Sequence, residues 1–255
     1  MKSVKRAACL GLSVLMASLM LAGCSQDKTP DKDNSTGSTA NEAIDIRMAV
    51  IKGPTGVGAV NLWANQDEGT ASNRYTIETV TAPDAAVSKI ASGDVDVAAV
   101  PTNAAAALYA KTNGNVQVLA VNTLGVLYMM ENGETIQSVA DLKGKTIYST
   151  GQGANPEYVL NYILEKNGLT PGKDVTIKFV TENDELAALM IKGDASIAMV
   201  PEPLGTTLKS KKATLRTALN MTEEWDNVAD GKSSLMMGCI VARKDFVAAH
   251  PDGIR

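Results

Sequence analysis

The chain has 255 residues, of which 45% are hydrophobic, 20% charged and 4% aromatic. This composition is typical of a globular protein with a buried core, and it excludes disordered, collagen-like and coiled-coil proteins. The formal net charge is −4, and it becomes 21 − 28 = −7 without the basic residues Lys2, Lys5 and Arg6, so nucleic acid is not an expected partner.

The few histidines and cysteines limit the chemistry that the chain can perform. His250 is its one histidine, and Cys239 is its one cysteine beyond residue 24. This inventory disfavours a Cys/His zinc site, a disulfide framework and a Ser-His-Asp triad, unless His250 itself serves. We therefore expect no metal, no cofactor and no catalytic residue.

Residues 1–24 have the pattern of an export signal. A basic start is followed by an apolar run from Ala7 to Met20, which is too short to span a bilayer. The sequence LAGC, Leu21–Cys24, resembles the bacterial lipobox. The resemblance implies that residues 1–23 are a signal peptide and that Cys24 carries acyl chains such as palmitate, which anchor the protein to a membrane. The alternative is a plain signal peptide in which the cysteine is accidental.

Residues 24–43 are rich in Ser, Thr, Asp, Asn and Lys and offer no large apolar side chain for burial. Such a segment cannot offset the entropy lost on ordering. We interpret it as a flexible tether between the lipid and the folded body, or alternatively as a solvated tail that acts only as a spacer.

The folded part repeats itself at an offset of 100 residues. Tyr75–Pro101 aligns without gaps with Val175–Pro201, and ten of the 27 positions are identical. Upstream, Gly53 aligns with Gly153 and Asn61 with Asn161. The alternative is a chance similarity between two strand-helix-strand units, which predicts the same architecture for both halves.

Each half reads as strand, glycine-rich turn, helix, strand, helix, strand. The first half is expected to form Ile46–Ile51, a turn, Val57–Gln66, Tyr75–Val80, Asp84–Ser92 and Val95–Val100. The second is expected to form Lys145–Thr150, a turn, a helix through Lys166, Val175–Val180, Asp184–Lys192 and Ala195–Val200. Alternating strands and helices predict parallel sheets covered on both faces, and so two doubly wound α/β lobes.

Ligands of open parallel sheets bind where the strands end. In this chain the predicted strand ends and the loops after them are Lys52–Gly56, Thr81–Asp84, Pro101–Asn103, Asn122–Leu124, Gly151–Pro156, Thr181–Asp184 and Pro201–Pro203. If the lobes face each other, these loops line one cleft, which is a natural site for a small molecule.

The glycine-rich turns do not match nucleotide-binding motifs. Gly53–Gly58 is not G-x-G-x-x-G, and Ala59 stands where a P-loop has lysine. Free backbone N–H groups there could hold a carboxylate or sulfonate near Thr55 and Gly56, although a purely structural turn fits equally well. In Gly151–Pro156 we expect Gly153 and Asn155 to contact ligand, with Asn155 as the helix cap.

Two proline motifs follow the third strand of each half, Pro101-Thr102-Asn103 and Pro201-Glu202-Pro203. We predict Thr102, Asn103 and Glu202 as ligand contacts; alternatively, Thr102 and Glu202 cap the following helices. Lys52 is the only cation of the predicted cleft loops. We therefore expect a solute whose nitrogen faces Glu202, rather than a strongly anionic one.

These motifs together resemble the type II extracellular solute-binding proteins of ABC importers. The likeness covers residues 46–255 and is carried by Ala140–Ile147, Gly153–Leu169, Lys192–Pro203 and Val241–Asp252. It is closest to the branch for nitrate, alkanesulfonates, taurine and thiamine-pyrimidine precursors. The resemblance implies capture of a small polar organic solute at the extracytoplasmic face of the cell membrane by a monomer, and delivery to an ABC permease and its ATPase.

The same resemblance implies a two-strand hinge, near Leu124–Met130 and Leu235–Val241. Lobe one is then residues 44–125 plus 236–255, and lobe two is residues 126–235. The chain stops at Arg255, where relatives begin a helical C-terminal region, so we expect a truncated and less stable lobe one. Two other classes stay open: a bilobal enzyme of pyrimidine or thiamine-precursor metabolism, which the single histidine disfavours, and a surface lipoprotein without a transport role.

Overall fold

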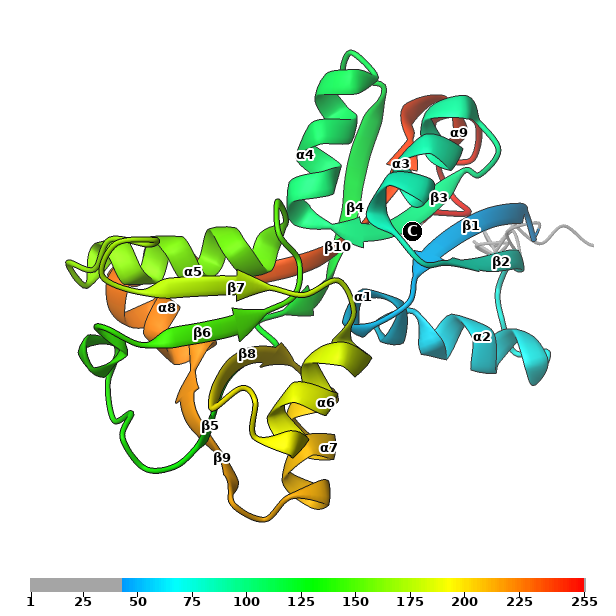
Figure 1. The fold of residues 1–255 in the computed structure, drawn as a ribbon. Helices are drawn as coiled ribbons and strands as arrows, with labels where there is room; N and C mark the ends of the chain where they lie inside the picture. The colour runs from blue at the N-terminus through cyan, green and yellow to red at the C-terminus, as the bar shows by residue number, and fades with distance from the viewer. Residues whose placement is uncertain (1–42, 255) are drawn as a thin grey trace, which may run out of the picture. The chain divides into compact units, whose positions relative to one another are not determined.

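The computed structural model describes residues 43–254. The predicted signal peptide, the lipidation of Cys24 and nearly all of the tether lie outside these residues. Within them the chain forms two five-stranded sheets, each flanked by helices, and we call each sheet with its helices a lobe (Figure 1). The predicted architecture of two α/β lobes is confirmed.

Lobe one contains the sheet with strand order β2-β1-β3-β10-β4. Its strands are β1 (Asp45–Ile51), β2 (Arg74–Val80), β3 (Val97–Pro101), β4 (Val116–Leu124) and β10 (Met236–Arg243). Its helices are α1 (Pro54–Val57), α2 (Val60–Asp67), α3 (Pro83–Ser92), α4 (Thr102–Lys111) and α9 (Lys244–Ala249).

Lobe two contains the sheet with strand order β7-β6-β8-β5-β9. Its strands are β5 (Leu127–Asn132), β6 (Thr146–Ser149), β7 (Thr176–Phe179), β8 (Ile197–Pro201) and β9 (Leu215–Asn220). Its helices are the short 3-10 helix η1 (Val139–Leu142), α5 (Asn155–Lys166), α6 (Asn183–Lys192), α7 (Leu204–Lys211) and α8 (Met221–Ala229).

The prediction of parallel sheets is confirmed for the pairs that β1 forms with β2 and β3 and that β6 forms with β7 and β8, but it is wrong for one strand in each sheet, which is antiparallel. β10 lies antiparallel between β3 and β4, and β5 lies antiparallel between β8 and β9. The physical reason is that the chain passes twice between the lobes. Each arriving strand enters its sheet against the direction of its neighbours, with Gly238 opposite Pro101 in lobe one and Leu127 opposite Pro201 in lobe two.

The internal repeat is visible in the helices and strands. β3 and β8 begin and end at positions 100 residues apart, and so do α3 and α6. Both of these helices end at a glycine in the left-handed region, Gly93 with φ 83° and Gly193 with φ 91°, a conformation that favours glycine over residues with a Cβ. The same local signals therefore end the same helix in both lobes.

One predicted helix differs from the structure. The sequence predicts a single helix over Val57–Gln66, whereas the structure has α1 and then α2. The break falls at Gly58, where a Cβ would lie 2.7 Å from the backbone oxygen of Asn122. Close packing of this turn against the end of β4 separates the two short helices.

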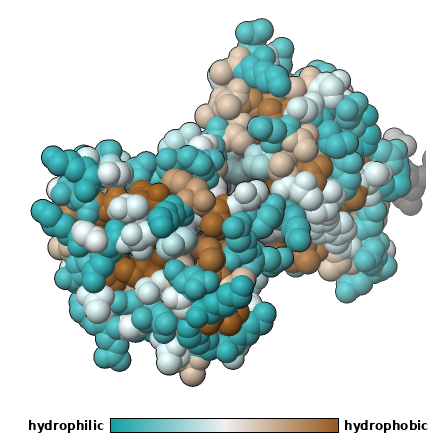
Figure 2. Space-filling model, viewed as in Figure 1, coloured by the Kyte–Doolittle hydropathy of each residue, from teal (hydrophilic) through white to brown (hydrophobic). Residues whose placement is uncertain are grey.

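Alternating side chains bury both faces of each sheet, as the period of two in a strand requires. In lobe one, α3 and α4 cover the face that carries Ala98 and Val100, and α2 and α9 cover the opposite face. In lobe two, α5, α8 and η1 cover one face, and α6 and α7 cover the other. On the surface seen in Figure 2, hydrophobic residues are visible among hydrophilic ones over both lobes as well as where the lobes meet.

Two short segments connect the sheets, one between β4 and β5 and one before β10. We keep the lobe boundaries 125/126 and 235/236 as a proposal, since they fall within these segments. The first segment is packed tightly: a Cβ on Gly125 would lie 1.9 Å from Thr222 Oγ1 of α8. Glycine is therefore required where the chain leaves lobe one.

Candidate ligand-binding site

A cavity of about 180 Å³ lies between the lobes. Residues from lobe one and from the segment that follows it are Ile51, Lys52, Pro54, Thr55, Pro101, Thr123, Val126 and Met237. Residues from lobe two are Leu127, Ser149, Thr150, Ala154, Asn155, Pro156, Asn183, Met199 and Pro201. Both lobes therefore supply walls of the same cavity.

The cavity lies where the parallel strands end. Six of the seven predicted cleft loops contribute to its lining, and Thr81–Asp84 does not. Several lining residues are 100 positions apart, including the pairs Thr55 and Asn155, and Pro101 and Pro201. The two halves of the repeat thus face each other across the cavity.

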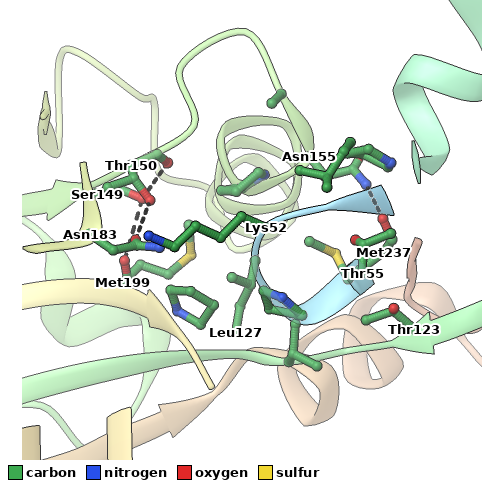
Figure 3. Close-up of a pocket in the computed structure, with 17 residues that line it drawn as sticks. Lys52, Thr55, Thr123, Leu127, Ser149, Thr150, Asn155, Asn183, Met199 and Met237 are labelled. Atoms are coloured by element: carbon green, nitrogen blue, oxygen red, sulfur yellow. Dashed lines mark hydrogen bonds between the residues drawn. The ribbon is translucent and has the colours of Figure 1, made fainter. Parts of the chain in front are cut away.

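Lys52 is the only charged residue among those that line the cavity. It follows β1 in lobe one, and its side chain extends toward Ser149, Thr150 and Asn183 of lobe two (Figure 3). Within residues 43–254 none of the ion pairs involves Lys52. The cavity therefore carries a positive charge that pairs with no carboxylate in the described part of the chain.

On the lobe-two side of the cavity, hydrogen bonds within the protein determine which polar groups are left to donate to a ligand. Thr150 Oγ1 donates to Asn183 Oδ1 at 3.1 Å. Ser149 Oγ donates to the carbonyl oxygen of Thr150 at 3.1 Å. Because the Asn183 oxygen accepts from Thr150, the amide nitrogen of Asn183 joins the Lys52 ammonium as a donor for a bound molecule.

Asn155 has a different role from the predicted helix cap. The N-cap of α5 is Ala154, and no side chain caps this helix. Asn155 Nδ2 instead donates to Thr102 Oγ1 at 3.0 Å and to the carbonyl oxygen of Met237 at 2.8 Å, both in lobe one. The prediction that Asn155 is a cap is wrong, because Asn155 is already the first residue of the helix and its side-chain oxygen accepts no bond from the first turn.

Glu202 lines a neighbouring hollow of about 440 Å³ and not this cavity. Its carboxylate accepts hydrogen bonds from Thr206 N and Thr206 Oγ1, both at 3.1 Å. Glu202 therefore satisfies an N–H group in the first turn of α7, as the capping alternative predicts.

The remaining predicted contacts lie around the cavity. Thr55 and Asn155 line it, whereas Gly56, Thr102, Asn103 and Gly153 do not. Gly153 N donates to Glu157 Oε2 at 2.6 Å, so this amide is already paired. Gly56 is buried in α1, where a Cβ would lie 2.4 Å from the carbonyl oxygen of Ile51, so glycine allows α1 to pack onto the end of β1.

Buried ionisable groups lie away from the cavity. Burial raises the pKa of Asp96, but hydrogen bonds from Arg47 outweigh it, so this pKa lies below its ordinary value. Burial likewise raises the pKa of Glu131, and bonds from Thr135, Ile136 and Arg216 lower it further than burial raises it. Burial raises the pKa of the Cys239 thiol. These carboxylates stabilise the lobes and do not contact the cavity.

Sequence reasoning missed Ser149, Thr150 and Asn183 as site residues. Thr150 ends the predicted strand Lys145–Thr150, and Asn183 lies in the predicted cleft loop Thr181–Asp184. The available signal was the position of these polar residues at a predicted strand end or in a predicted cleft loop. No group of His, Cys, Asp and Glu within residues 43–254 could hold a metal ion.

Residues 69–248 match the family model described as periplasmic substrate-binding protein of phosphonate ABC transporters. No curated protein matches the chain significantly.

Solved structures of low sequence identity share the fold. An ABC transporter protein from Parabacteroides distasonis is 20% identical, with a TM-score of 0.64 over 82% of this chain and 71% of that one. The aliphatic sulphonate-binding protein SsuA from Escherichia coli is 14% identical, with a TM-score of 0.61 over 81% and 67%. The nitrate-binding protein NrtA from Synechocystis is 15% identical, with a TM-score of 0.57 over 83% and 58%.

Proposed function

Because this chain belongs to the family of periplasmic substrate-binding proteins of phosphonate ABC transporters, we propose that its cavity binds a small organic oxyanion, a phosphonate or sulfonate. The protein delivers this solute to an ABC permease and its ATPase, and it has no enzymatic activity. The observation that carries the proposal is Lys52, the single charge among the lining residues.

Electrostatics favours an anion over the amine expected from the sequence. A bound oxyanion would pair with Lys52 and accept hydrogen bonds. A bound protonated amine would instead lie near the Lys52 ammonium, and no carboxylate among the lining residues would neutralise the two positive charges. The expectation of an amine rested on Glu202, whose carboxylate is bonded to Thr206. Two proteins of similar structure are named as binding aliphatic sulphonates and nitrate, which also supports an anionic solute.

The neighbouring hollow supports a second candidate, an amino-oxyanion such as taurine. This hollow shares Pro54, Thr123 and Val126 with the cavity and contains Glu202. One zwitterionic ligand would then fill both spaces. Its oxyanion would lie at Lys52 in the cavity, and its amine would lie at Glu202 in the neighbouring hollow. This candidate keeps the predicted contact with Glu202, and Thr55 would lie on the oxyanion side.

We place the protein at the extracytoplasmic face of the cell membrane as a lipid-anchored monomer. The family description supports this location, and LAGC supports lipid on Cys24. Within residues 43–254 no helix has the length and hydrophobicity needed to span a membrane. Detergent partitioning of the wild type and of Cys24→Ala tests the anchor, because both would stay in the aqueous phase if Cys24 carries no lipid.

Isothermal titration calorimetry of the full chain with methylphosphonate, methanesulfonate, taurine, nitrate and an aminopyrimidine tests the ligand class. We expect an oxyanion to bind, and Lys52→Met to weaken that binding by about tenfold or more, the effect of a lost charge-assisted bond. Lys52→Arg keeps the charge, and Lys211→Met removes an exposed lysine of α7 as the matched control.

Two outcomes would contradict the proposal. One is tight binding of the uncharged aminopyrimidine alone, and the other is oxyanion binding that Lys52→Met leaves unchanged. Taurine binding that weakens in Glu202→Gln, while methanesulfonate binding does not, would favour the zwitterionic candidate.

A further inference from the structure

Asn155 joins three elements, α5, α4 and β10, and lines the cavity. It is the first residue of α5 in lobe two and is buried, with 8% of its surface exposed. It lines both the ligand cavity and a second hollow of about 470 Å³, whose other walls include Tyr158, Tyr162 and Trp225. The side chain therefore lies inside the junction of the lobes.

Both amide hydrogens of Asn155 are used by lobe one. Nδ2 donates to the carbonyl oxygen of Met237 at 2.8 Å and to Thr102 Oγ1 at 3.0 Å. Thr102 Oγ1 in turn donates to the carbonyl oxygen of Met236 at 2.9 Å. A carbonyl oxygen can only accept, so these bonds determine the orientation of the Asn155 amide and the direction of the Thr102 hydroxyl.

These bonds lie beside the second of the two segments that connect the lobes. The first segment is held by packing, because Gly125 leaves no space for a side chain against Thr222. At the second segment, Met236 and Met237 of β10 accept the hydrogen bonds from Thr102 and Asn155. One connection is thus held by close contact and the other by hydrogen bonds.

We propose that Asn155 and Thr102 are positioning residues that form an interlobe clamp and set the affinity for ligand without donating to it. The clamp holds α5 against lobe one, at the separation where Lys52 extends toward Thr150 and Asn183. The effect on affinity rests on the oxyanion-binding function proposed above. The effect on lobe separation does not.

The affinity for ligand depends on the fraction of molecules whose lobes are already arranged to bind it. A ligand that needs contacts from both lobes binds only the arrangement that presents them together, so apparent affinity falls with the population of that arrangement. Removing one clamp partner leaves a buried polar group unpaired, which favours arrangements in which water reaches it. The variants should therefore shift the lobes apart before ligand is added.

Pulsed electron paramagnetic resonance on the full chain measures that shift. Spin labels at Asn61→Cys on α2 and Ala188→Cys on α6 report one lobe each. We expect Asn155→Ala and Thr102→Val to move the ligand-free distances to longer values, and Thr102→Ser to keep the wild-type distances. Thr112→Val is the matched control, since Thr112 Oγ1 donates only within lobe one, to the carbonyl oxygens of Leu108 and Tyr109.

Calorimetry with methanesulfonate gives the second readout. We expect about fivefold weaker binding in Thr102→Val, the effect of one hydrogen bond. Because the two residues act as a pair, Thr102→Val should cause no further loss when Asn155 is already Ala. Thermal melting of each ligand-free variant checks that it is folded.

The outcomes separate this inference from the proposed function. Unchanged distances in both Asn155→Ala and Thr102→Val would overturn the clamp, as would additive losses of affinity in the double variant. Longer distances in both variants, with no oxyanion binding by the wild type, would support the clamp and overturn the proposed function.

Discussion

The two lobes share one topology and fill it with side chains of different size. At equivalent positions 100 residues apart, lobe one has Ala86 and Ala99 where lobe two has Leu186 and Met199, and all four are buried. Ala86 and Leu186 belong to the core between sheet and helix α3 or α6, whereas Ala99 and Met199 lie on the opposite face of the sheet, so the difference in side-chain size extends to both faces. The same fold therefore tolerates two core designs, provided that each is closely packed.

The lobes also bury one carboxylate each, with different partners. Asp96 in lobe one contacts two arginines, with Arg47 at 2.7 Å and Arg243 at 3.8 Å. Glu131 in lobe two pairs with a single arginine, Arg216 at 2.7 Å, and also accepts bonds from Thr135 and Ile136. The stability of lobe two therefore depends more strongly on one side chain.

The largest expected effect comes from removing that side chain. Arg216→Met deletes the pair with Glu131 and the bonds to the carbonyl oxygens of Gly133 and Ile136. We expect a loss of about 3–5 kcal/mol in the free energy of unfolding, typical of breaking a buried ion pair. Arg47→Met should cost less, about 1–3 kcal/mol, because Asp96 keeps Arg243.

Urea denaturation of both variants measures this difference. Lys232→Met is the control, since its ion pair with Asp230 is exposed and exposed pairs contribute at most about 1 kcal/mol. Equal losses in the two arginine variants would show that the second arginine does not compensate in lobe one.

The next largest loss of stability is expected when equivalent core residues of the two lobes are exchanged. Leu186→Ala places in α6 the residue that α3 has at the same position, and we expect a loss of about 2–5 kcal/mol from the cavity that it leaves. The reverse change, Ala86→Leu, should cost about 1–3 kcal/mol by overpacking. Urea denaturation checks both, and a neutral Ala86→Leu would mean that lobe one has unused space.

The smallest effect is the dependence of stability on pH. The pKa values of Asp96 and Glu131 are lowered in the folded state, so their contribution is complete above the unfolded pKa values, about 4. It is lost as pH falls through the folded values. We expect the melting temperature to fall below pH 4, and to fall less steeply in Glu131→Gln; parallel curves would contradict this.

Much of the fold could be predicted because its signals are local. The apolar alternation of Tyr75–Val80 predicts a strand, and the glycines at Gly93 and Gly193 end helices at the expected positions. The repeat at 100 residues predicts two lobes of one design, and the strand ends predict where the cavity lies. Lys52 could be identified as the cation of the cleft loops because it directly follows a predicted strand.

The remaining features depend on contacts between residues far apart in the chain. The insertion of β10 between β3 and β4 joins residues more than 100 positions apart. No local sequence pattern indicates whether such a strand is parallel or antiparallel to its neighbours. Asn155 reads as a helix cap because it precedes Pro156, yet its amide donates to partners 53 and 82 positions away. Glu202 follows a strand end, as a ligand contact would. Its carboxylate, however, accepts hydrogen bonds from Thr206, four residues further along the chain. Short-range periodicity determines helices and strands, whereas the partner of a polar side chain is decided only when the packed lobes bring donors and acceptors together.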